Sequence, residues 1–554
     1  MKINLQTAST CILSLICILV AFVYLFFIGN NPDHEGILYF SRRILNGDVF
    51  YNDIIGLNPP LIFYIYLIPS YLSKIIGTPT EYVLDLFTFA LIGVSLLYCN
   101  VIMSGSESFN DKKSRSLVLA IIATGLIFFA TFGVRGNFVN VFFADRDHLL
   151  CVLALPYFLI SMPLLRNAKV DNKHRIIISI LAGIGFCIKP QFSIIWLVPN
   201  IFLVANEKSF WKVFLRLENI IIYLVAIAYI SLVMLFYPEY VFQILPMITD
   251  YYSNNGTDST MRMLYILYLF VLPYFSFMYY TQNLAKNNEE SPMRVNILYL
   301  FSLVMAGMAL VFIGAGWPNS FYVFKLFIFF AVCLLVYEFY NAKKSTKDVK
   351  LSKKYSKGFN ISMIGVAYIC FISAISIHKD VKYNLKEPPQ YITKMQEYIE
   401  NNAESGKFMY ISSAMYPWDS TFATAEDNKK ISVQRFQSYY HFMMPFYRKF
   451  LEQNEMQKVV FDKEILNDRQ KYFWRFITDS TAEDVKKEPD IIIIQNHMDG
   501  ISVEDFFIAN EMFAKEWKNY QYVEKLDFCS DDASEEDALW CYKFDIYKRK
   551  LTGS

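Results

Sequence analysis

Charged residues are scarce in this chain of 554 residues, at 19% against 55% hydrophobic residues. Neither sign predominates, because 52 lysines and arginines are balanced by 51 aspartates and glutamates. This composition excludes a disordered chain and argues against an ordinary soluble domain. The near-zero net charge also leaves no global basic field that would hold a nucleic acid.

Several catalytic signatures are missing as well. The sequence contains no glycine-rich phosphate loop, no nucleophile elbow and no zinc motif. Its nine cysteines form no C-x-x-C pair, and seven lie in apolar stretches, where cysteine acts as a small hydrophobe. Only Cys529 and Cys541 lie in polar sequence. An oxidising compartment permits a disulfide between them, and two unpaired cysteines are the alternative.

Long hydrophobic runs are plentiful up to residue 378. A helix needs about 20 apolar residues to cross a bilayer core. The first run is too long for a removable signal peptide and lacks a small-residue cleavage site, so we expect it to be retained. The runs predict eleven transmembrane helices, at residues 10–29, 82–103, 116–134, 148–165, 175–190, 192–206, 218–236, 263–281, 295–313, 320–340 and 359–377. A further apolar piece at 60–76 is ambiguous.

Polar and mixed sequence follows from Lys379 onward. Helical patterns at 388–404, 436–455 and 503–517 alternate with strand-like runs at 407–412, 490–495 and 539–547. The predicted fold class is therefore a polytopic α-helical membrane protein over residues 1–378, followed by a separate α/β domain over 379–550. We interpret residues 551–554 as a remnant of protein expression.

The positions of lysine and arginine decide how the ambiguous piece at 60–76 is placed. If it lies along the membrane surface, and the N-terminus is inside, every basic short loop falls on the cytoplasmic side, as the positive-inside bias requires. If it crosses the membrane, the seven-lysine loop falls outside. The sequence thus predicts a first external loop at 30–81 and an extracytoplasmic C-terminal domain. The basic loops lie at 112–115, 166–175, 208–216, 286–294 and 343–357.

Two acidic motifs fall on the predicted outer side. NPDHEG (31–36) follows the first span, and ADRDH (144–148) stands at the mouth of the fourth. Asn31 can cap a helix that begins at Pro32 and ends before Gly47, which puts Asp33 and Glu35 in its first turn. Acidic clusters at the ends of different helices, facing one side, can converge on one pocket.

The segment PDHEGILYFSRRILNGDVFYNDIIGLNPPLIFYIYLIP (32–69) resembles the first external loop of membrane glycosyltransferases of the GT-C superfamily. The similarity is to the branch of protein O-mannosyltransferases and lipid A aminoarabinose transferases in particular. It extends over roughly residues 10–205, with ADRDHLL (144–150) as the second external acidic motif and GIGFCIKPQ (183–191) as the glycine-rich helix followed by a lysine. Beyond residue 205 only the general architecture matches.

The resemblance implies sugar transfer from a polyprenyl phosphate carrier to an acceptor hydroxyl, with inversion at the anomeric carbon. In this superfamily the acidic residue after the first span is the catalytic base, which assigns Asp33 here. One carboxylate can deprotonate the acceptor, and a phosphate leaves without being protonated. The alternative is that Asp33 is a solvated carboxylate, which interacts favourably with the positive end of the helix dipole.

Other charged residues receive roles from the same resemblance. Arg146, Lys189 and Lys325 are candidates to hold the carrier phosphate, and snorkelling to lipid headgroups is the alternative for the lysines. Glu35, Asp145, Asp147 and His148 are candidates to orient the acceptor or to bind a divalent cation such as Mg, Mn or Ca. The alternative for these four residues is a salt-bridge network with Arg146 and Arg135. Asp53 can orient the donor or cap a turn.

We therefore expect an enzyme of the bacterial inner membrane, with a periplasmic C-terminal domain. Its partners would be the lipid-linked sugar donor, a glycan, lipid or protein acceptor, and the bilayer, with no nucleic acid. A flippase for lipid-linked sugars is the alternative, and it predicts ionisable residues buried in mid-span and two related halves. A non-catalytic assembly factor would not explain so many spans or two outer acidic motifs.

Overall fold

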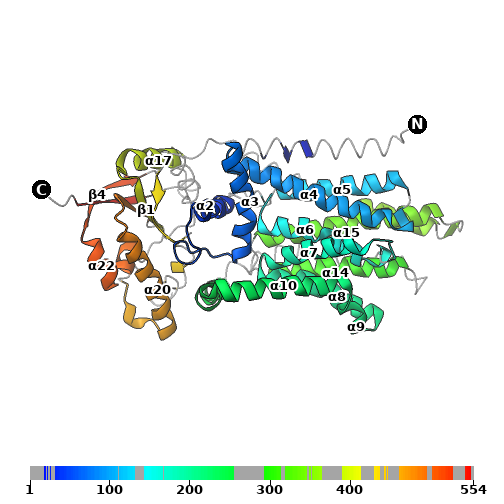
Figure 1. Cartoon of the computed structure of the whole chain (residues 1–554). Coiled ribbons are helices and arrows are strands. Elements are labelled where there is room, and N and C mark those ends of the chain that lie inside the picture. The colour runs from blue at the N-terminus through cyan, green and yellow to red at the C-terminus, as the bar shows by residue number, and fades with distance from the viewer. Residues whose placement is uncertain are drawn as a thin grey trace. The chain divides into compact units, whose positions relative to one another are not determined.

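The computed structural model shows a mostly helical chain with one small sheet near its C-terminus (Figure 1). It describes residues 18–19, 21–22, 25, 32–109, 111–131, 142–165, 167–254, 292–313, 318–345, 349–350, 352–364, 390–412, 430–436, 439, 442–443, 446, 461–495, 502–527 and 543–550.

The chain divides into two compact units, and neither is continuous in sequence. Unit 1 contains Met1–Asn31, Leu72–Leu232 and Gly256–Lys386. Unit 2 contains Pro32–Tyr71, Val233–Asn255 and Glu387–Ser554. The first predicted external loop thus falls largely in the same unit as the C-terminal domain. The predicted boundary at 378–379 lies outside the described residues and stays a prediction.

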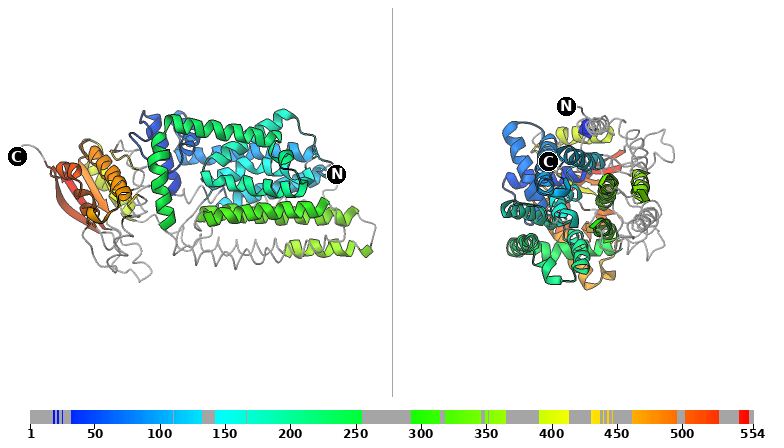
Figure 2. Two further views of the ribbon diagram at one scale, coloured as in Figure 1. Left: turned by 90° about the horizontal axis from the view of Figure 1, so that it is seen from below. Right: turned by 90° about the vertical axis from the view of Figure 1, so that its right-hand side faces the viewer.

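Unit 1 is a set of apolar helices that run alongside one another, and most are seen nearly end-on in Figure 2, right. Helix α6 packs against α7 and α4, and α14 packs against α15 and α8. Short 3₁₀ turns η1 (Glu107–Phe109), η2 (Pro163–Leu165) and η3 (Pro190–Phe192) lie in the connections. The helices are α4 (Thr80–Ser104), α5 (Lys112–Thr131), α6 (Arg146–Ser161), α7 (Asn172–Cys187), α8 (Ser193–Glu207), α9 (Phe210–Phe214), α10 (Leu217–Phe236, whose last residues belong to unit 2), α14 (Pro292–Ile313) and α15 (Pro318–Ser345).

Within the described part of the chain, four helices are long and apolar enough to cross a membrane. These are α4, α5, α10 and the stretch Tyr322–Tyr340 of α15, and each matches a predicted span. The predicted spans 148–165, 175–190, 192–206 and 295–313 are also helices (α6, α7, α8 and α14), with 16, 16, 15 and 22 residues. The span 263–281 lies outside the described residues, and 10–29 and 359–377 are described only in part. The total of eleven and the topology therefore stay predictions.

Unit 2 begins with the two helices of the first loop, α2 (Pro32–Leu45) and α3 (Pro60–Ile76). The end of α3, from Leu72 onward, belongs to unit 1. The helix predicted from NPDHEG is confirmed. Gly47 follows its end with φ +108°, a conformation that glycine adopts more readily than other residues, and its N–H donates to the carbonyl of Ile44 at 3.1 Å. The Ser41 hydroxyl lies 3.1 Å from the carbonyl oxygen of Phe63 and packs α2 onto α3.

The C-terminal part of unit 2 is built on a five-stranded mixed sheet in the order β2-β1-β3-β5-β4. Strand β1 (Lys407–Ser412) pairs in parallel with β2 (Ile431–Ser432) and β3 (Ile491–Gln495). Strand β5 (Lys543–Arg549) pairs antiparallel with β3 and with β4 (Tyr520–Asp527). The isoleucines of β3 are fully buried, as expected for a central strand covered on both faces.

The remaining helices that the structure describes in full in unit 2 are η4 (Tyr240–Ile244), α11 (Leu245–Asn254), α17 (Gln390–Asn402), η6 (Lys463–Ile465), α20 (Asp468–Val485), α21 (Val503–Ile508) and α22 (Glu511–Trp517). The helix predicted at 388–404 is confirmed as α17. The pattern at 503–517 forms two helices, because Asn510 caps α22 by accepting hydrogen bonds from the N–H groups of Met512 and Phe513. Helix α20 and strand β4 were not predicted from the sequence. The segments 436–455 and 539–547 are described only in part, and Cys529 and Cys541 lie outside the described residues.

Candidate functional site

Charged side chains, most of them buried, lie together at the start of α6, in unit 1. We call Asp145, Arg146, Asp147, His148 and Lys189 the α6 cluster. Asp145 is the N-cap of α6, and its carboxylate accepts hydrogen bonds from the backbone N–H of Arg146 at 2.6 Å and from its Nε at 3.0 Å. An acidic N-cap satisfies an otherwise unpaired N–H and lies at the positive end of the helix dipole. This cap explains locally why α6 begins at Arg146.

Asp147 and Lys189 form a second ion pair in the α6 cluster. Lys189 Nζ donates to Asp147 Oδ2 at 3.1 Å. The Asp147 side chain is 1% exposed and that of Lys189 is 16% exposed. Lys189 precedes Pro190 in the break between α7 and α8, so the pair ties this break to the start of α6. Within the described residues, Asp147 Oδ1 has no hydrogen-bond partner.

His148 is buried in the first turn of α6. Its Nδ1 accepts a hydrogen bond from the Ala144 N–H at 2.9 Å, which assigns the proton of a neutral imidazole to Nε2. Ala144 has φ +67°, which is uncommon for a residue with a side chain and aims its N–H at the ring. The imidazole lies 5.0 Å from the ring of Phe143 and 5.5 Å from that of Tyr322. The motif therefore forms a compact, fixed turn.

Lys325 reaches the same end of unit 1 on another helix. It lies in α15, is 7% exposed and follows Tyr322 by three residues, so the two share one helix face. Because the Tyr322 ring contacts His148, this face lies beside the α6 cluster. The structure thus joins Asp145 to Arg146 and Asp147 to Lys189 by direct contact, and it brings Lys325 close through its helix.

The predicted cation ligands are only partly described. Within the described residues, no group of three or more His, Cys, Asp or Glu side chains is suited to a metal ion. The Asp145 carboxylate is held by Arg146, and Nδ1 of His148 by the Ala144 N–H. Glu35, the fourth predicted ligand, has a side chain outside the described residues. The cation site therefore stays a prediction, and no chemical step is assigned to it.

Asp33 and Glu35 lie in the first turn of α2, as predicted, and their side chains are outside the described residues. His34 between them is fully buried, with its ring 6.4 Å from that of Tyr66. Because α2 belongs to unit 2 and α6 to unit 1, the expectation that the two acidic motifs share one pocket also stays a prediction.

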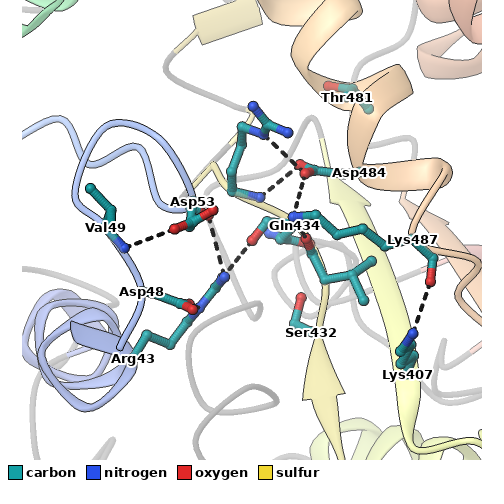
Figure 3. Close-up of polar contacts among 12 residues, drawn as sticks. Arg43, Asp48, Val49, Asp53, Lys407, Ser432, Gln434, Thr481, Asp484 and Lys487 are labelled. Atoms are coloured by element: carbon teal, nitrogen blue, oxygen red, sulfur yellow. Dashed lines mark hydrogen bonds and ion pairs between the residues drawn. The ribbon is translucent and has the colours of Figure 1, made fainter. Parts of the chain in front are cut away.

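Asp53 takes part in a turn. Its carboxylate accepts the Val49 N–H at 2.8 Å, and its carbonyl oxygen lies 3.3 Å from Nη2 of Arg43 (Figure 3). This is the turn contact that the sequence analysis gave as the alternative role, and a role in orienting the donor stays a prediction.

Two residues with unusual environments were missed by the sequence analysis. Arg43 of α2 is 7% exposed, and nothing in the pair Arg42-Arg43 distinguishes it from a solvated helix end. Asp85 of α4 is 8% exposed, and its Oδ1 has no hydrogen-bond partner within the described part of the chain. A signal for Asp85 was available, because it is an acidic residue inside the apolar run 82–103.

Comparisons with known proteins assign no family. No family model matches the sequence, and no curated protein matches it. Among solved structures, the crystal structure of ArnT from Cupriavidus metallidurans bound to undecaprenyl phosphate is similar at 13% sequence identity and a TM-score of 0.49. The match covers 96% of this chain and 97% of that chain. At this identity and TM-score, the likeness assigns neither an activity nor a site residue to the present chain.

Proposed function

We propose that this chain is an integral-membrane glycosyltransferase of the GT-C type, which transfers a sugar from a polyprenyl phosphate carrier to a hydroxyl of a glycan, lipid or protein. We place the reaction at the outer face of a bacterial inner membrane. The observation that carries the proposal is the Asp147–Lys189 pair among apolar helices, in which the aspartate is buried, the lysine is half-buried, and one carboxylate oxygen is unpartnered within the described residues. Burying the Asp147 charge costs several kcal/mol, so such a pair in an apolar unit indicates a functional site.

The α6 cluster suits the phosphate of the carrier. A lysine ammonium has three N–H groups, and Lys189 directs one of them at Asp147. The other two can donate to phosphate oxygens while the carboxylate holds the ammonium in place. Positive charge at this point stabilises the negative charge that grows on the departing phosphate. Arg146 and Lys325 are proposed to add further positive charge near the phosphate.

Asp33 is proposed as the general base, on the resemblance of its motif. As the acceptor oxygen attacks the anomeric carbon, its proton passes to the Asp33 carboxylate and a new carbon–oxygen bond forms. The bond between the anomeric carbon and the phosphate oxygen breaks, and the phosphate leaves with the electron pair. A base of this kind contributes about 10²–10⁴-fold to the rate. The carrier phosphate needs no proton donor, because it is already a good leaving group.

The buried ionisable residues of the described spans favour transfer over transport. A flippase is expected to carry ionisable groups at mid-span. Asp85 lies near the beginning of α4, and Glu338 lies near the end of the apolar stretch Tyr322–Tyr340, where Asn296 Nδ2 donates to it at 2.6 Å. Neither is at the centre of its span.

The test compares Asp33→Asn with Asp111→Asn. Asp111 also stands at the start of a helix, with its carboxylate accepting the N–H groups of Lys113 and Ser114, but it lies in an exposed turn away from the α6 cluster. The purified variants are supplied with polyprenyl phosphate sugars and candidate acceptors, and products are identified by mass spectrometry. We expect Asp33→Asn to bind donor and make no glycoside, while Asp111→Asn retains activity.

Full activity of Asp33→Asn would refute the assigned base. If the wild-type protein moves lipid-linked sugar between leaflets and makes no glycoside, the glycosyltransferase proposal fails and the flippase takes its place.

A further inference from the structure

A buried arginine ties the helix that carries Asp33 to the C-terminal domain, one turn after Tyr39, whose hydroxyl donates to the carbonyl oxygen of Ser432 at 3.5 Å. Arg43, near the end of α2, donates from Nε to the carboxylate of Asp48 and from Nη1 to the carbonyl oxygen of Gln434 at 2.6 Å. Its Nη2 lies 3.3 Å from the carbonyl oxygen of Asp53. Figure 3 shows that the guanidinium therefore joins three pieces of chain: α2, the turn that follows it, and the segment 431–436 of the C-terminal domain.

A backbone contact runs beside this arginine. Ile55 and Phe436 form a parallel β-bridge, in which the Ile55 N–H donates to the carbonyl of Arg435 at 2.5 Å. Ile55 and Phe436 are both buried. The first loop and the C-terminal domain are thus joined by main-chain and side-chain hydrogen bonds, although Arg43 and Gln434 are 391 residues apart in sequence.

The segment 431–436 is itself held firmly within the C-terminal domain. The Val433 N–H donates to the carbonyl of Phe408 in β1 at 2.9 Å, and the Gln434 side chain accepts the Tyr410 N–H at 2.9 Å. On its other side, Arg435 donates from its backbone N–H and from Nε to Asp484 of α20, at 2.8 and 3.0 Å. Sheet and helix therefore fix the carbonyl groups that Arg43 and Ile55 bind.

The guanidinium of Arg43 stays protonated at this position. Burial acts to lower the pKa of the guanidinium, but the nearby Tyr39 and Asp48 outweigh it, and the pKa is raised from its ordinary value. A charged donor forms stronger hydrogen bonds than a neutral one. Replacing Arg43 by an apolar side chain leaves the carbonyl of Gln434, a residue 2% exposed, without this donor.

We propose that Arg43 is a positioning residue, through which the C-terminal domain sets the place of α2 and hence of Asp33. The inference rests on the proposed function. Arg43 and Asp33 lie ten residues apart on one helix, about 15 Å along its axis, so a shift at one end moves the other. A displacement of about 1 Å at a reacting group costs about 10²-fold in rate.

The experiment compares Arg43→Met and Arg43→Lys with Lys407→Met in the full-length protein. Lys407 is the matched control, because its Nζ also donates to a backbone carbonyl, that of Lys487, but within the C-terminal domain (Figure 3). We expect kcat of Arg43→Met to fall about 10²-fold with donor KM unchanged, since donor binding is assigned to the α6 cluster. Arg43→Lys keeps the charge and should recover part of the rate, and Lys407→Met should resemble the wild type.

Hydrogen exchange separates positioning from folding. In Arg43→Met the amides of α2 should exchange faster while β1 and β3 stay protected. Unchanged kcat, unchanged protection of α2, or loss of protection throughout β3 would each overturn the proposal. If the wild-type protein makes no glycoside, the proposed function fails on its own, and exchange of α2 alone decides whether Arg43 couples it to the C-terminal domain.

Discussion

Removing one partner of the Asp147–Lys189 pair should affect stability unequally, depending on which partner is removed. Lys189→Met leaves a carboxylate that is 1% exposed and has lost its only cation at hydrogen-bond distance within the described residues. Breaking a buried pair in this way costs about 3–5 kcal/mol. Asp147→Asn removes the charge instead and leaves an ammonium whose side chain is 16% exposed. Because that ammonium can turn to water, the cost should be closer to that of one lost hydrogen bond, about 1–2 kcal/mol.

The double variant tests the cause of this inequality. In Asp147→Asn/Lys189→Met no charge remains buried at this point, so most of the stability lost in Lys189→Met should return. Glycosyl transfer should not return, because the proposed phosphate-binding cation is absent. Stability is read from the thermal unfolding midpoint of each purified variant in one detergent, and activity from donor KM and product yield.

Three results would contradict this reasoning. Equal destabilisation by the two single changes would mean that both partners are comparably solvated. A double variant no more stable than Lys189→Met would show that the stranded carboxylate is not the source of the cost. A double variant with normal donor KM would show that Lys189 does not bind the donor phosphate. The Asp147–Lys189 pair of the wild type would then have a structural role only.

Two further changes probe elements of unit 2. Gly47→Ala should cost about 1–2 kcal/mol, because φ is +108° and an added Cβ would meet no atom within 4 Å, so backbone strain alone acts; unfolding of the variant in denaturant measures this, and an unchanged midpoint would contradict it. Asn510→Ala should cost about 2 kcal/mol, since it removes the cap of α22 and the hydrogen bonds from Nδ2 to Thr478 and Asp479. Asn510→Ser keeps a capping oxygen without placing a second carboxylate against Asp479 and should lose less; equal losses would assign the whole effect to Nδ2.

Local sequence patterns predicted the elements whose signal lies within one turn or one run. Pro32 and Gly47 bracket α2 because each favours the backbone conformation required at its position. The run of isoleucines at 491–494 indicated a strand, and it forms the buried centre of the sheet. An ion-pair network was the alternative given for ADRDH, and Arg146 does pair with Asp145.

Elements with weak local signals were missed for physical reasons. Strand β4 is almost wholly exposed at the edge of the sheet, so its residues show no apolar alternation. Helix α20 is a polar helix, and its buried face includes the polar residues Thr478, Thr481 and Asp484, which weaken the apolar periodicity. Its start carries a capping box, in which Asn467 and Gln470 exchange hydrogen bonds, and this was the signal available in the sequence.

The membership of α2 in the same compact unit as the C-terminal domain depends on contacts that no local rule reveals. In the sequence, Arg43 resembles any basic residue in the last turn of a helix, where a positive charge interacts favourably with the helix dipole. Its burial depends on a carbonyl almost four hundred residues away, and that carbonyl is in place only because β1 and α20 hold the segment 431–436. Hydropathy separates apolar spans from polar sequence, and it therefore divides this chain at one point near residue 378. Contacts divide it differently, since the polar loop after the first span and the polar domain at the C-terminus bury their surfaces against each other.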